Sequence, residues 1–383
     1  MTFPLTQPQR ELKERARQFA REVVAPHVEE MDRTNNYPWP VVKAMAEQRF
    51  MGMNVPREYG GDARSLLDVV LVVEEVAKTC GTAARIVVDG NMGIVGAIRH
   101  YGTEAQRRRY LPWVLDGEKP AIAITEPEAG SAATMMTTSA RRDGQSFVLS
   151  GEKRWITGAG VSQLYLVFAR VDDVPGAAGI GGFLVEATTP GLSVPKVRWM
   201  MGLRGMPEGD VVFRDCRISA DALMVAPGNG FKRLMTSYNS QRVGAATVAL
   251  GIAQGAFDLA LDYAKKREQF GRKIAEFQGL QWMLADMHRQ LESARLLIYH
   301  AAQNAGDGFP DALEAATAKV SAAEAAIAVT NAALQIHGAV GYSCELPLER
   351  MVRDARMFAI GGGTVEVQKN LIASRLLGGR GDG

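Results

Sequence analysis

The sequence lacks the features that mark several classes of protein. Among its 383 residues, 44 lysines and arginines nearly balance 42 aspartates and glutamates, so the basic bias of nucleic-acid binders is missing. The sequence has no long run of uncharged apolar residues, which argues against a transmembrane helix. Its first residues are charged and contain no apolar segment typical of a secretory signal. We therefore expect no nucleic-acid partner and no membrane partner.

Cysteine and histidine are also scarce. The three cysteines, Cys80, Cys216 and Cys344, lie far apart and form neither a C-x-x-C pair nor a zinc-binding spacing. The five histidines show no metal-binding spacing either. This pattern predicts no metal site and indicates a reducing, cytoplasmic location.

What is present changes along the chain in three zones, as the length of the chain leads one to expect. Residues 1–118 carry apolar side chains at helical spacing, as at Leu12 and Phe19. Residues 119–226 contain short β-branched and aromatic runs such as SFVLSG and LYLVFARV, separated by turn residues. That pattern is typical of a small antiparallel barrel or sandwich. Residues 227–383 contain alanine-rich stretches long enough for a helical bundle.

Two motifs in the middle zone have the composition of a ligand-binding surface. The run ITEPEAGS begins at Ile124 and Thr125 and ends at Gly130 and Ser131. Its small residues would let backbone N–H groups approach a flat ligand or a thioester. An ordinary turn after a strand has a similar composition. The run GEKRWITG then supplies Trp155 and a threonine two residues later, Thr157. An aromatic side chain packs well on a flat ring, but a lone tryptophan in a strand more often lies in the core.

Three further segments lie in the last zone. The run REQFGR contains Arg267 and Phe270, and Gln278 follows it. A guanidinium group offers paired donors to a pyrophosphate, whereas a solitary arginine on a helix is usually only a surface charge. Gln335 and Gly338 lie in QIHG. The segment RDARMFAIGGGT completes the set near the C-terminus.

Together these motifs resemble those of the acyl-CoA dehydrogenase family, and the resemblance covers nearly the whole chain. It implies an α+β multidomain fold: an N-terminal α-helical domain at 1–118, a middle antiparallel β-barrel at 119–226 and a C-terminal four-helix bundle at 227–383. It also implies an acyl-CoA substrate, bound FAD and a homotetramer that is a dimer of dimers, with each FAD site completed by a neighbouring subunit. The FAD-contacting residues that it implies are Ile124, Thr125, Gly130, Ser131, Trp155, Thr157, Arg267, Phe270, Gln278, Gln335, Gly338, Thr364 and Glu366.

The catalytic base of the family is missing from both of its usual positions. The family motif ends I-Y-E-G-T, and its glutamate removes the substrate α-proton, but Gly361 and Gly362 occupy the Tyr and Glu positions here. Some family members carry the base on a helix of the last domain, where this chain has Gln241. An amide cannot act as a carboxylate base near neutral pH. Glu366 follows nearby but is expected on the wrong side of the turn.

Arg85 suggests what the site binds. It lies in TCGTAARIVVDGN, a nearly uncharged helix that lines the acyl pocket in the family. A buried arginine without a partner is unfavourable, so an anion at the far end of the substrate would explain it. The alternative is a pair with Asp89, one helical turn away.

This combination resembles a desulfinase branch of the family, which converts 3-sulfinopropionyl-CoA and water to propionyl-CoA and sulfite without an electron-transfer partner. The expected catalytic residues are Arg85, Gln241 and Gly362, with the backbone N–H of Gly362 polarising the thioester carbonyl. The expected substrate-binding residues are Arg85, Ser131, Tyr238, Gln241, Arg242 and Gly362. One alternative is a dehydrogenase for a short acyl-CoA with a distal carboxylate. The other is a catalytically inactive, FAD-binding structural or regulatory paralogue.

Overall fold

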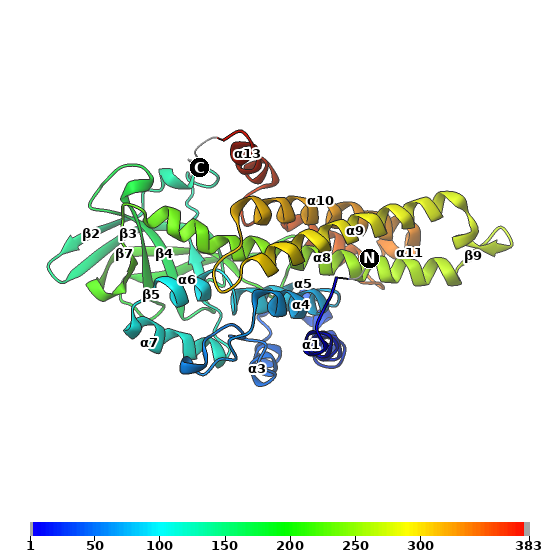
Figure 1. Ribbon diagram of the computed structural model, residues 1–383, viewed down its shortest axis with the longest axis horizontal. Helices are drawn as coiled ribbons and strands as arrows, with labels where there is room; N and C mark the ends of the chain where they lie inside the picture. Colours follow the sequence, from blue (N-terminus) through cyan, green and yellow to red (C-terminus); the bar gives the residue numbers. More distant parts are fainter. Residues whose placement is uncertain (1–2, 379–383) are drawn as a thin grey trace.

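The computed structural model describes residues 3–378 and shows helices, then a β-sheet, then helices along the chain (Figure 1). Thr6, Ser65 and Thr103 start three of the first helices, because each hydroxyl accepts a backbone N–H at the helix N-terminus. The helices of this part are α1 (Gln7–Phe19), α2 (Val28–Thr34), α3 (Trp39–Glu47), α4 (Leu66–Ala77), α5 (Gly81–Asp89), α6 (Ile94–Tyr101) and α7 (Glu104–Leu115).

The middle part is one sheet with strand order β6-β7-β3-β2-β4-β5-β8, and β1 pairs with β4. Its strands are β1 (Ala121–Ala123), β2 (Ser139–Asp143), β3 (Ser146–Thr157), β4 (Leu164–Val171), β5 (Ile180–Glu186), β6 (Leu192–Arg198), β7 (Glu208–Ser219) and β8 (Leu223–Val225). Apolar side chains of β3, β4, β5 and β7 form its core.

The sheet differs from the expected antiparallel barrel in two ways. It is mixed, because β1 and β2 both run parallel to β4. The reason is that the chain leaves β3 and places β4 beside β2 instead of beside β3, so β2 and β4 point the same way. The sheet is also open, because no pairing joins its end strands β6 and β8 in the described chain. Local alternation of residues predicts strands but does not determine their order.

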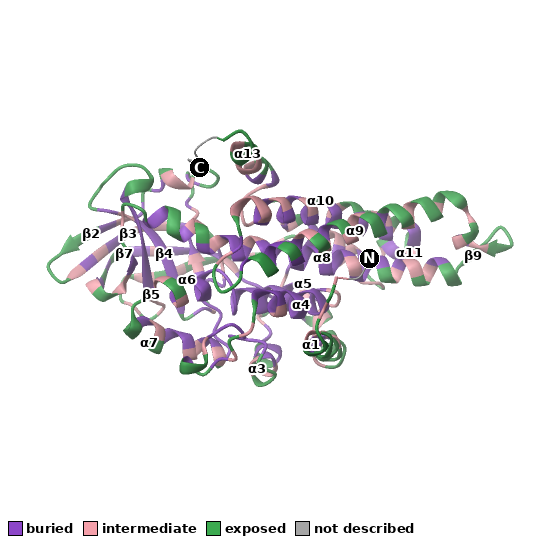
Figure 2. Ribbon diagram, viewed as in Figure 1, coloured by how far each residue is buried: buried purple, intermediate pink, exposed green. Residues whose placement is uncertain are grey.

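The last part is built on three long helices, with shorter helices packed on them (Figure 1). They are α8 (Gly230–Lys266), α9 (Gln278–Asn304), α10 (Ala312–His337), α11 (Ala339–Tyr342), α12 (Leu348–Met357) and α13 (Val365–Leu376). By length and composition α8 could cross a membrane, but 83% of its most apolar window is buried inside the protein. Figure 2 shows the same burial along α8, which makes it the central core helix.

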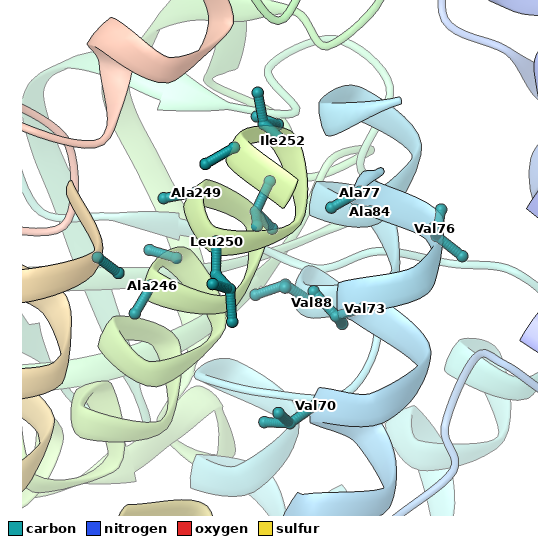
Figure 3. Packing of buried hydrophobic residues seen from close by; sticks show 14 of the residues in the cluster. Val70, Val73, Val76, Ala77, Ala84, Val88, Ala246, Ala249, Leu250 and Ile252 are labelled. Atoms are coloured by element: carbon teal, nitrogen blue, oxygen red, sulfur yellow. The ribbon is translucent and has the colours of Figure 1, made fainter. Parts of the chain in front are cut away.

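Helices α4, α5 and α8 pack closely together and form the framework of the site (Figure 3). Val73 and Ala77 of α4 face Leu250 and its neighbours on α8. The approach is close because α8 has glycine at the contact: a Cβ on Gly251 would lie 2.4 Å from the Cβ of Ala77. A Cβ on Gly255 would lie 2.3 Å from the backbone oxygen of Lys78, the residue that follows α4. Any larger residue would push the two helices apart.

Between α8 and α9 the chain forms a two-stranded hairpin of β9 (Glu268–Gln269) and β10 (Arg272–Lys273). It projects from the end of the long helices, whereas the sheet lies at the opposite end of the molecule (Figure 1).

Candidate active site

Three charged and polar side chains surround one buried carboxylate, that of Asp89 at the end of α5. Arg85 Nε donates to Asp89 Oδ1 at 3.0 Å, and Gln241 Nε2 of α8 donates to the same oxygen at 2.6 Å. Lys119 Nζ lies 3.4 Å from Asp89 Oδ2. All four residues are buried, and we call them the Asp89 cluster.

The local structure explains why Arg85 and Asp89 face the same way. Four residues apart on an α-helix, their side chains lie on one face. Burial opposes the charge of Arg85, but the attraction of Asp89, Tyr238 and Glu208 together outweighs it and raises the pKa of the guanidinium. Only Nε of Arg85 has a protein hydrogen-bond partner in the described chain, so Nη1 and Nη2 remain available as a pair of donors. The pair with Asp89, which the sequence offered as the alternative to an anion-binding role, is therefore present. It does not use Nη1 and Nη2 of Arg85.

Gln241 has one polar atom without a partner. Its Oε1 is buried and accepts no hydrogen bond in the part of the chain that the structure describes. Gly93 lies directly against it, because a Cβ there would approach Gln241 Oε1 to 2.7 Å. The amide is held by Asp89 through its nitrogen, so its oxygen is free to accept a bond from a ligand or water.

Two strand residues extend the cluster toward the sheet. Lys119 Nζ donates to the backbone oxygen of Thr157 at 3.2 Å, and the Thr157 hydroxyl donates to Glu208 Oε1 at 2.6 Å. Thr157 and Glu208 are register partners on β3 and β7. Loss of water contact raises the pKa of Glu208 to about 7, although the Thr157 hydrogen bond, Arg85 and Lys119 act against this.

Tyr238 and Arg242 lie one helical turn apart on α8, next to Gln241. The guanidinium of Arg242 lies 5.7 Å from the Tyr238 ring centre, and its Nη1 donates to Asn239 Oδ1 at 2.7 Å. Burial lowers the pKa of Arg242, and its Nε has no partner among the described residues. Arg242 therefore adds positive charge beside Gln241 and retains an unused donor.

The glycine loop, Gly361 to Gly363, follows α12. Gly362 has φ +74°, in the left-handed region that favours glycine, and a Cβ there would meet nothing within 4 Å. No acceptor binds its N–H in the described chain, so this donor is free. Lys319 Nζ donates to the backbone oxygen of Gly363 and holds the loop. Thr364 caps α13, and Glu366 in the first turn of that helix is exposed.

The loop after β1, which carries Thr125, Gly130 and Ser131, is held by a buried ion pair. Lys153 Nζ lies 2.8 Å from Glu126 Oε1 and also donates to the backbone oxygen of Ile124. Gly130 and Ser131 are exposed, and a Cβ on Gly130 would meet nothing within 4 Å. The loop thus has a rigid base and an open outer edge.

Trp155 is not a core residue, so the structure excludes one of the two alternatives left open by the sequence. It lies near the end of β3 with 50% of its surface exposed, and the Arg198 guanidinium stacks 4.4 Å from its ring centre. Its φ of +59° is unusual for a tryptophan, so the strand turns its side chain outward here. A large exposed aromatic at the end of the sheet is suited to covering a flat ligand.

The remaining predicted FAD contacts lie far from that loop. Arg267, Phe270 and Gln278 belong to the hairpin region at the end of the long helices, opposite the sheet (Figure 1). Phe270 is 94% exposed at the tip of the hairpin. Gln335 and Gly338 end α10 and are exposed. One chain therefore does not bring the two sets of motifs together.

Sequence reasoning missed Lys119 and Glu208, and it weighed Asp89 only as an alternative partner for Arg85. The four-residue spacing could have predicted the pair of Arg85 with Asp89. No local signal marks Lys119, which lies between a glutamate and a proline, or Glu208, which follows another proline. Charged residues at strand ends are usually solvated, but here Lys119 is buried and Glu208 is half-buried, and both bind residues distant in the sequence.

Comparison with protein families gives matches along almost the whole chain. Residues 6–118 match the acyl-CoA dehydrogenase N-terminal domain, residues 121–216 the middle domain and residues 228–377 the C-terminal domain. The chain belongs to the acyl-CoA dehydrogenase family. The three-part fold expected from the sequence is confirmed at this level.

Among the curated relatives of this acyl-CoA dehydrogenase family member is a 3-sulfinopropanoyl-CoA desulfinase of Paraburkholderia xenovorans. It is 56% identical over 380 residues, which cover 98% of this chain and 97% of that protein. A protein of the same name from Cupriavidus necator is 52% identical over 98% of this chain and 96% of its own length.

Solved structures of the acyl-CoA dehydrogenase family superpose closely on this chain. Butyryl-CoA dehydrogenase from Megasphaera elsdenii has a TM-score of 0.95 and 35% identity, over 98% of this chain and 100% of that one. A glutaryl-CoA dehydrogenase from Mycobacterium smegmatis in complex with FADH2 has a TM-score of 0.91 and 26% identity, over 98% and 95%.

The family implies FAD, and the residues of this chain fit it. Exposed Trp155 offers an aromatic face, and the open edge of the loop at Gly130 and Ser131 leaves backbone groups accessible beside it. A flat, hydrogen-bonding ring can be held by such a combination.

Proposed function

We propose that the protein is an FAD-containing desulfinase that converts 3-sulfinopropionyl-CoA and water to propionyl-CoA and sulfite. The observation that carries the proposal is Arg85, a buried arginine whose two outer nitrogens are free while Asp89 fixes its inner one. A guanidinium held this way presents a planar pair of donors to a sulfinate group. The 56% identity to a protein named as a desulfinase supports the same substrate.

The absence of a base also supports a reaction without α-proton abstraction. Gly362 has no side chain, and Gln241 is an amide bound to Asp89. We propose that the free N–H of Gly362 polarises the thioester carbonyl and that Gln241 Oε1 accepts a hydrogen bond from water beside the sulfinate. Tyr238 and Arg242 would line the same region from α8, with Ser131 contacting the CoA portion.

FAD, when bound, would supply a hydroxyl group for the thioester oxygen and a flat redox-active ring. Ile124, Thr125, Gly130, Ser131, Trp155 and Thr157 would hold it on one subunit. Since Arg267, Phe270 and Gln278 lie at the other end of the chain, we propose that they complete the FAD site of a second subunit, together with Gln335 and Gly338. Thr364 and Glu366 would contact it from the start of α13.

This arrangement supports a homotetramer built as a dimer of dimers. The exposed apolar side chains Phe270, Trp282 and Tyr342 lie on the helical part and would be covered in such an assembly. We further propose domain boundaries at residues 118/119 and 226/227. Cys80, Cys216 and Cys344 are free thiols, which suits a cytoplasmic location.

The deciding experiment is incubation of the purified protein with 3-sulfinopropionyl-CoA in the absence of any electron acceptor. We expect sulfite and propionyl-CoA in equal amounts, with no lasting loss of flavin absorbance. A dehydrogenase for an acyl-CoA with a distal carboxylate would instead bleach its flavin with glutaryl-CoA and reduce a dye. An inactive paralogue would do neither, and either result would refute the proposal.

A further inference from the structure

One carboxyl group beside the Asp89 cluster has no role in the reaction as described so far. Glu208 begins β7 and accepts a hydrogen bond from the Thr157 hydroxyl at 2.6 Å. Its pKa, raised by loss of solvation to about 7, leaves it partly protonated at neutral pH. A carboxyl group in this state can release and regain a proton under working conditions.

The surroundings of Glu208 come from several elements. The charged or titratable groups whose fields act on it belong to α5, to the segment before β1 and to α8: Arg85, Asp89, Lys119 and Tyr238. On the neighbouring strand β6, Arg198 pairs with Glu208 through the backbone, but its guanidinium binds Asp210 at 2.6 Å. The only hydrogen-bond partner of the Glu208 side chain in the described chain is therefore the Thr157 hydroxyl.

We propose that Glu208 holds the proton that the substrate carbon receives when the carbon–sulfur bond breaks, and that the Thr157 hydroxyl passes it on. This inference rests on the desulfinase function proposed above. The Thr157 hydroxyl donates to Glu208 Oε1 when Glu208 is ionised. Once Glu208 is protonated, its O–H can donate to the Thr157 oxygen instead, which frees the Thr157 proton for the substrate. Glu208 acts through Thr157 and is thus a positioning residue that stores the proton.

The position of Arg85 places this proton near the bond that breaks. If Arg85 holds the sulfinate, then carbon 3, which is bonded to the sulfur, lies directly beside it. A series of contacts links Arg85 to Glu208: Arg85 binds Asp89, Lys119 binds Asp89 and the Thr157 backbone oxygen, and the Thr157 hydroxyl binds Glu208. Thr157 lies between the Asp89 cluster and Glu208, because Lys119 binds both Asp89 and the Thr157 backbone.

The step balances without an external oxidant. The bond between carbon 3 and sulfur breaks, and its electron pair stays on carbon, which takes the proton from Thr157 as Thr157 takes one from Glu208. Sulfur leaves as sulfur dioxide, is oxidised in the same step, and adds water to give bisulfite and a proton. That proton restores the Glu208 carboxyl group. The sum is sulfinate plus water giving a methyl group and bisulfite.

The test uses the flavin-loaded enzyme and the variants Glu208→Gln and Glu118→Gln. Glu118 is a matched control: burial raises the pKa of its carboxyl group too, but its Oε1 accepts the backbone N–H of Gln163 at 2.6 Å. In wild-type protein, kcat for sulfite release should fall as pH rises through about 7, because the protonated form is needed. Glu208→Gln should lower kcat by about 100-fold and remove that pH dependence, with KM little changed. Glu118→Gln should keep both kcat and its pH profile.

A second readout does not depend on turnover. Infrared difference spectra of wild-type protein should show a protonated carboxyl band at pH 6 that disappears at pH 8, and Glu208→Gln should lack it. If Glu208→Gln does not fold, Thr157→Val and Thr157→Ser replace it in the test. Thr157→Val should abolish the pH-dependent sulfite release. Thr157→Ser, which keeps the hydroxyl, should retain it.

The test distinguishes failure of the proton-storage role from failure of the proposed function. Normal sulfite release by Glu208→Gln with an unchanged pH profile, or by Thr157→Val, would overturn the proton-storage role alone. An absence of sulfite release from wild-type protein would overturn the proposed function and this inference with it.

Discussion

Helices α4 and α5 each bury acidic side chains, but the two sets are partnered differently. Glu74 and Glu75 of α4 face Lys13 of α1 and Arg295 of α9, among other groups. Arg295 Nε lies 3.0 Å from Glu74, and Tyr299 also donates to this carboxylate. We call this group the Glu74 cluster: Lys13, Arg17, Glu74, Glu75, Lys78, Arg295 and Tyr299.

The pKa values of the carboxyl groups shift in opposite directions in these two regions. Burial alone would raise the pKa of Glu74, but Lys13, Arg295, Lys78 and the Tyr299 hydrogen bond together outweigh it and lower the pKa to about 2. Beside the Asp89 cluster, Glu208 keeps a pKa near 7, and Gln241 Oε1 lacks a partner. A cluster with every charge paired ties helices together. A cluster with unused donors and acceptors is prepared for a ligand.

The largest expected effect comes from breaking the complete cluster. Glu74→Ala should lower the free energy of unfolding by about 3–5 kcal/mol, because it removes a buried carboxylate that pairs with Lys13 and Arg295 and accepts the Tyr299 hydroxyl. Thermal and denaturant unfolding would measure this. The control Glu14→Ala removes an exposed partner of Arg17, 2.6 Å away, and should change stability by less than about 1 kcal/mol. Equal effects of the two variants would contradict the structural role of the Glu74 cluster.

The next largest effect concerns turnover instead of stability. Arg85→Ala should lower kcat/KM for sulfite release by tens- to thousands-fold, about 2–5 kcal/mol, because the substrate anion loses its charged partner. Arg85→Lys should also lower kcat/KM strongly, since lysine keeps the charge but lacks the planar pair of donors. Flavin content and melting temperature should change little, because Asp89 retains Lys119 and Gln241. A lower melting temperature with normal sulfite release would favour a purely structural Arg85–Asp89 pair.

A smaller effect depends on pH. The pKa of Glu208 is about 7 in the folded protein against 4.5 ordinarily, so its contribution to stability is greatest below pH 4.5 and is lost as pH rises through 7. Glu208→Gln should therefore gain stability relative to wild type, by about 2–3 kcal/mol between pH 4.5 and 8. Melting curves across this range would measure the gain.

Glu126→Gln is the control for these melting curves, and its stability should change in the opposite direction. Lys153 outweighs burial and lowers the pKa of Glu126 to about 2, so its stabilising contribution is present above pH 4.5 and is lost toward pH 2. Glu126→Gln should be less stable than wild type at pH 7. A Glu208→Gln variant that behaves like Glu126→Gln would mean that Glu208 is fully paired.

The smallest effect tests whether the missing base can be restored. Gln241→Glu would place a carboxylate against Asp89 Oδ1, which now lies 2.6 Å from the amide nitrogen. Like charges raise a carboxyl pKa, so the variant should lose roughly 1–2 kcal/mol of stability as pH rises above 5, since one pKa unit corresponds to about 1.4 kcal/mol. Flavin bleaching with butyryl-CoA should stay weak. Rapid bleaching would show that the new carboxylate reaches the substrate instead of Asp89.

Sequence patterns predicted the three-part fold because helical and strand periodicities are local properties. They did not predict the mixed, open sheet, since strand order depends on where β4 lies relative to β2. The i,i+4 spacing was enough to pair Arg85 with Asp89. Glu208 and Lys119 could not be predicted, because the bonds of Glu208 to Thr157 and of Lys119 to Asp89 join segments distant in the sequence.

The glycines of α8 have a consequence for anyone who surveys mutations across this protein. Gly251 and Gly255 leave no room for a side chain between α4 and α8, the two helices that carry Glu74 and Gln241. In a saturation screen scored by growth, both positions would look as intolerant as Arg85. Assays of soluble yield would separate them, since the glycine variants should be lost during production, whereas Arg85 variants should accumulate normally and be inactive.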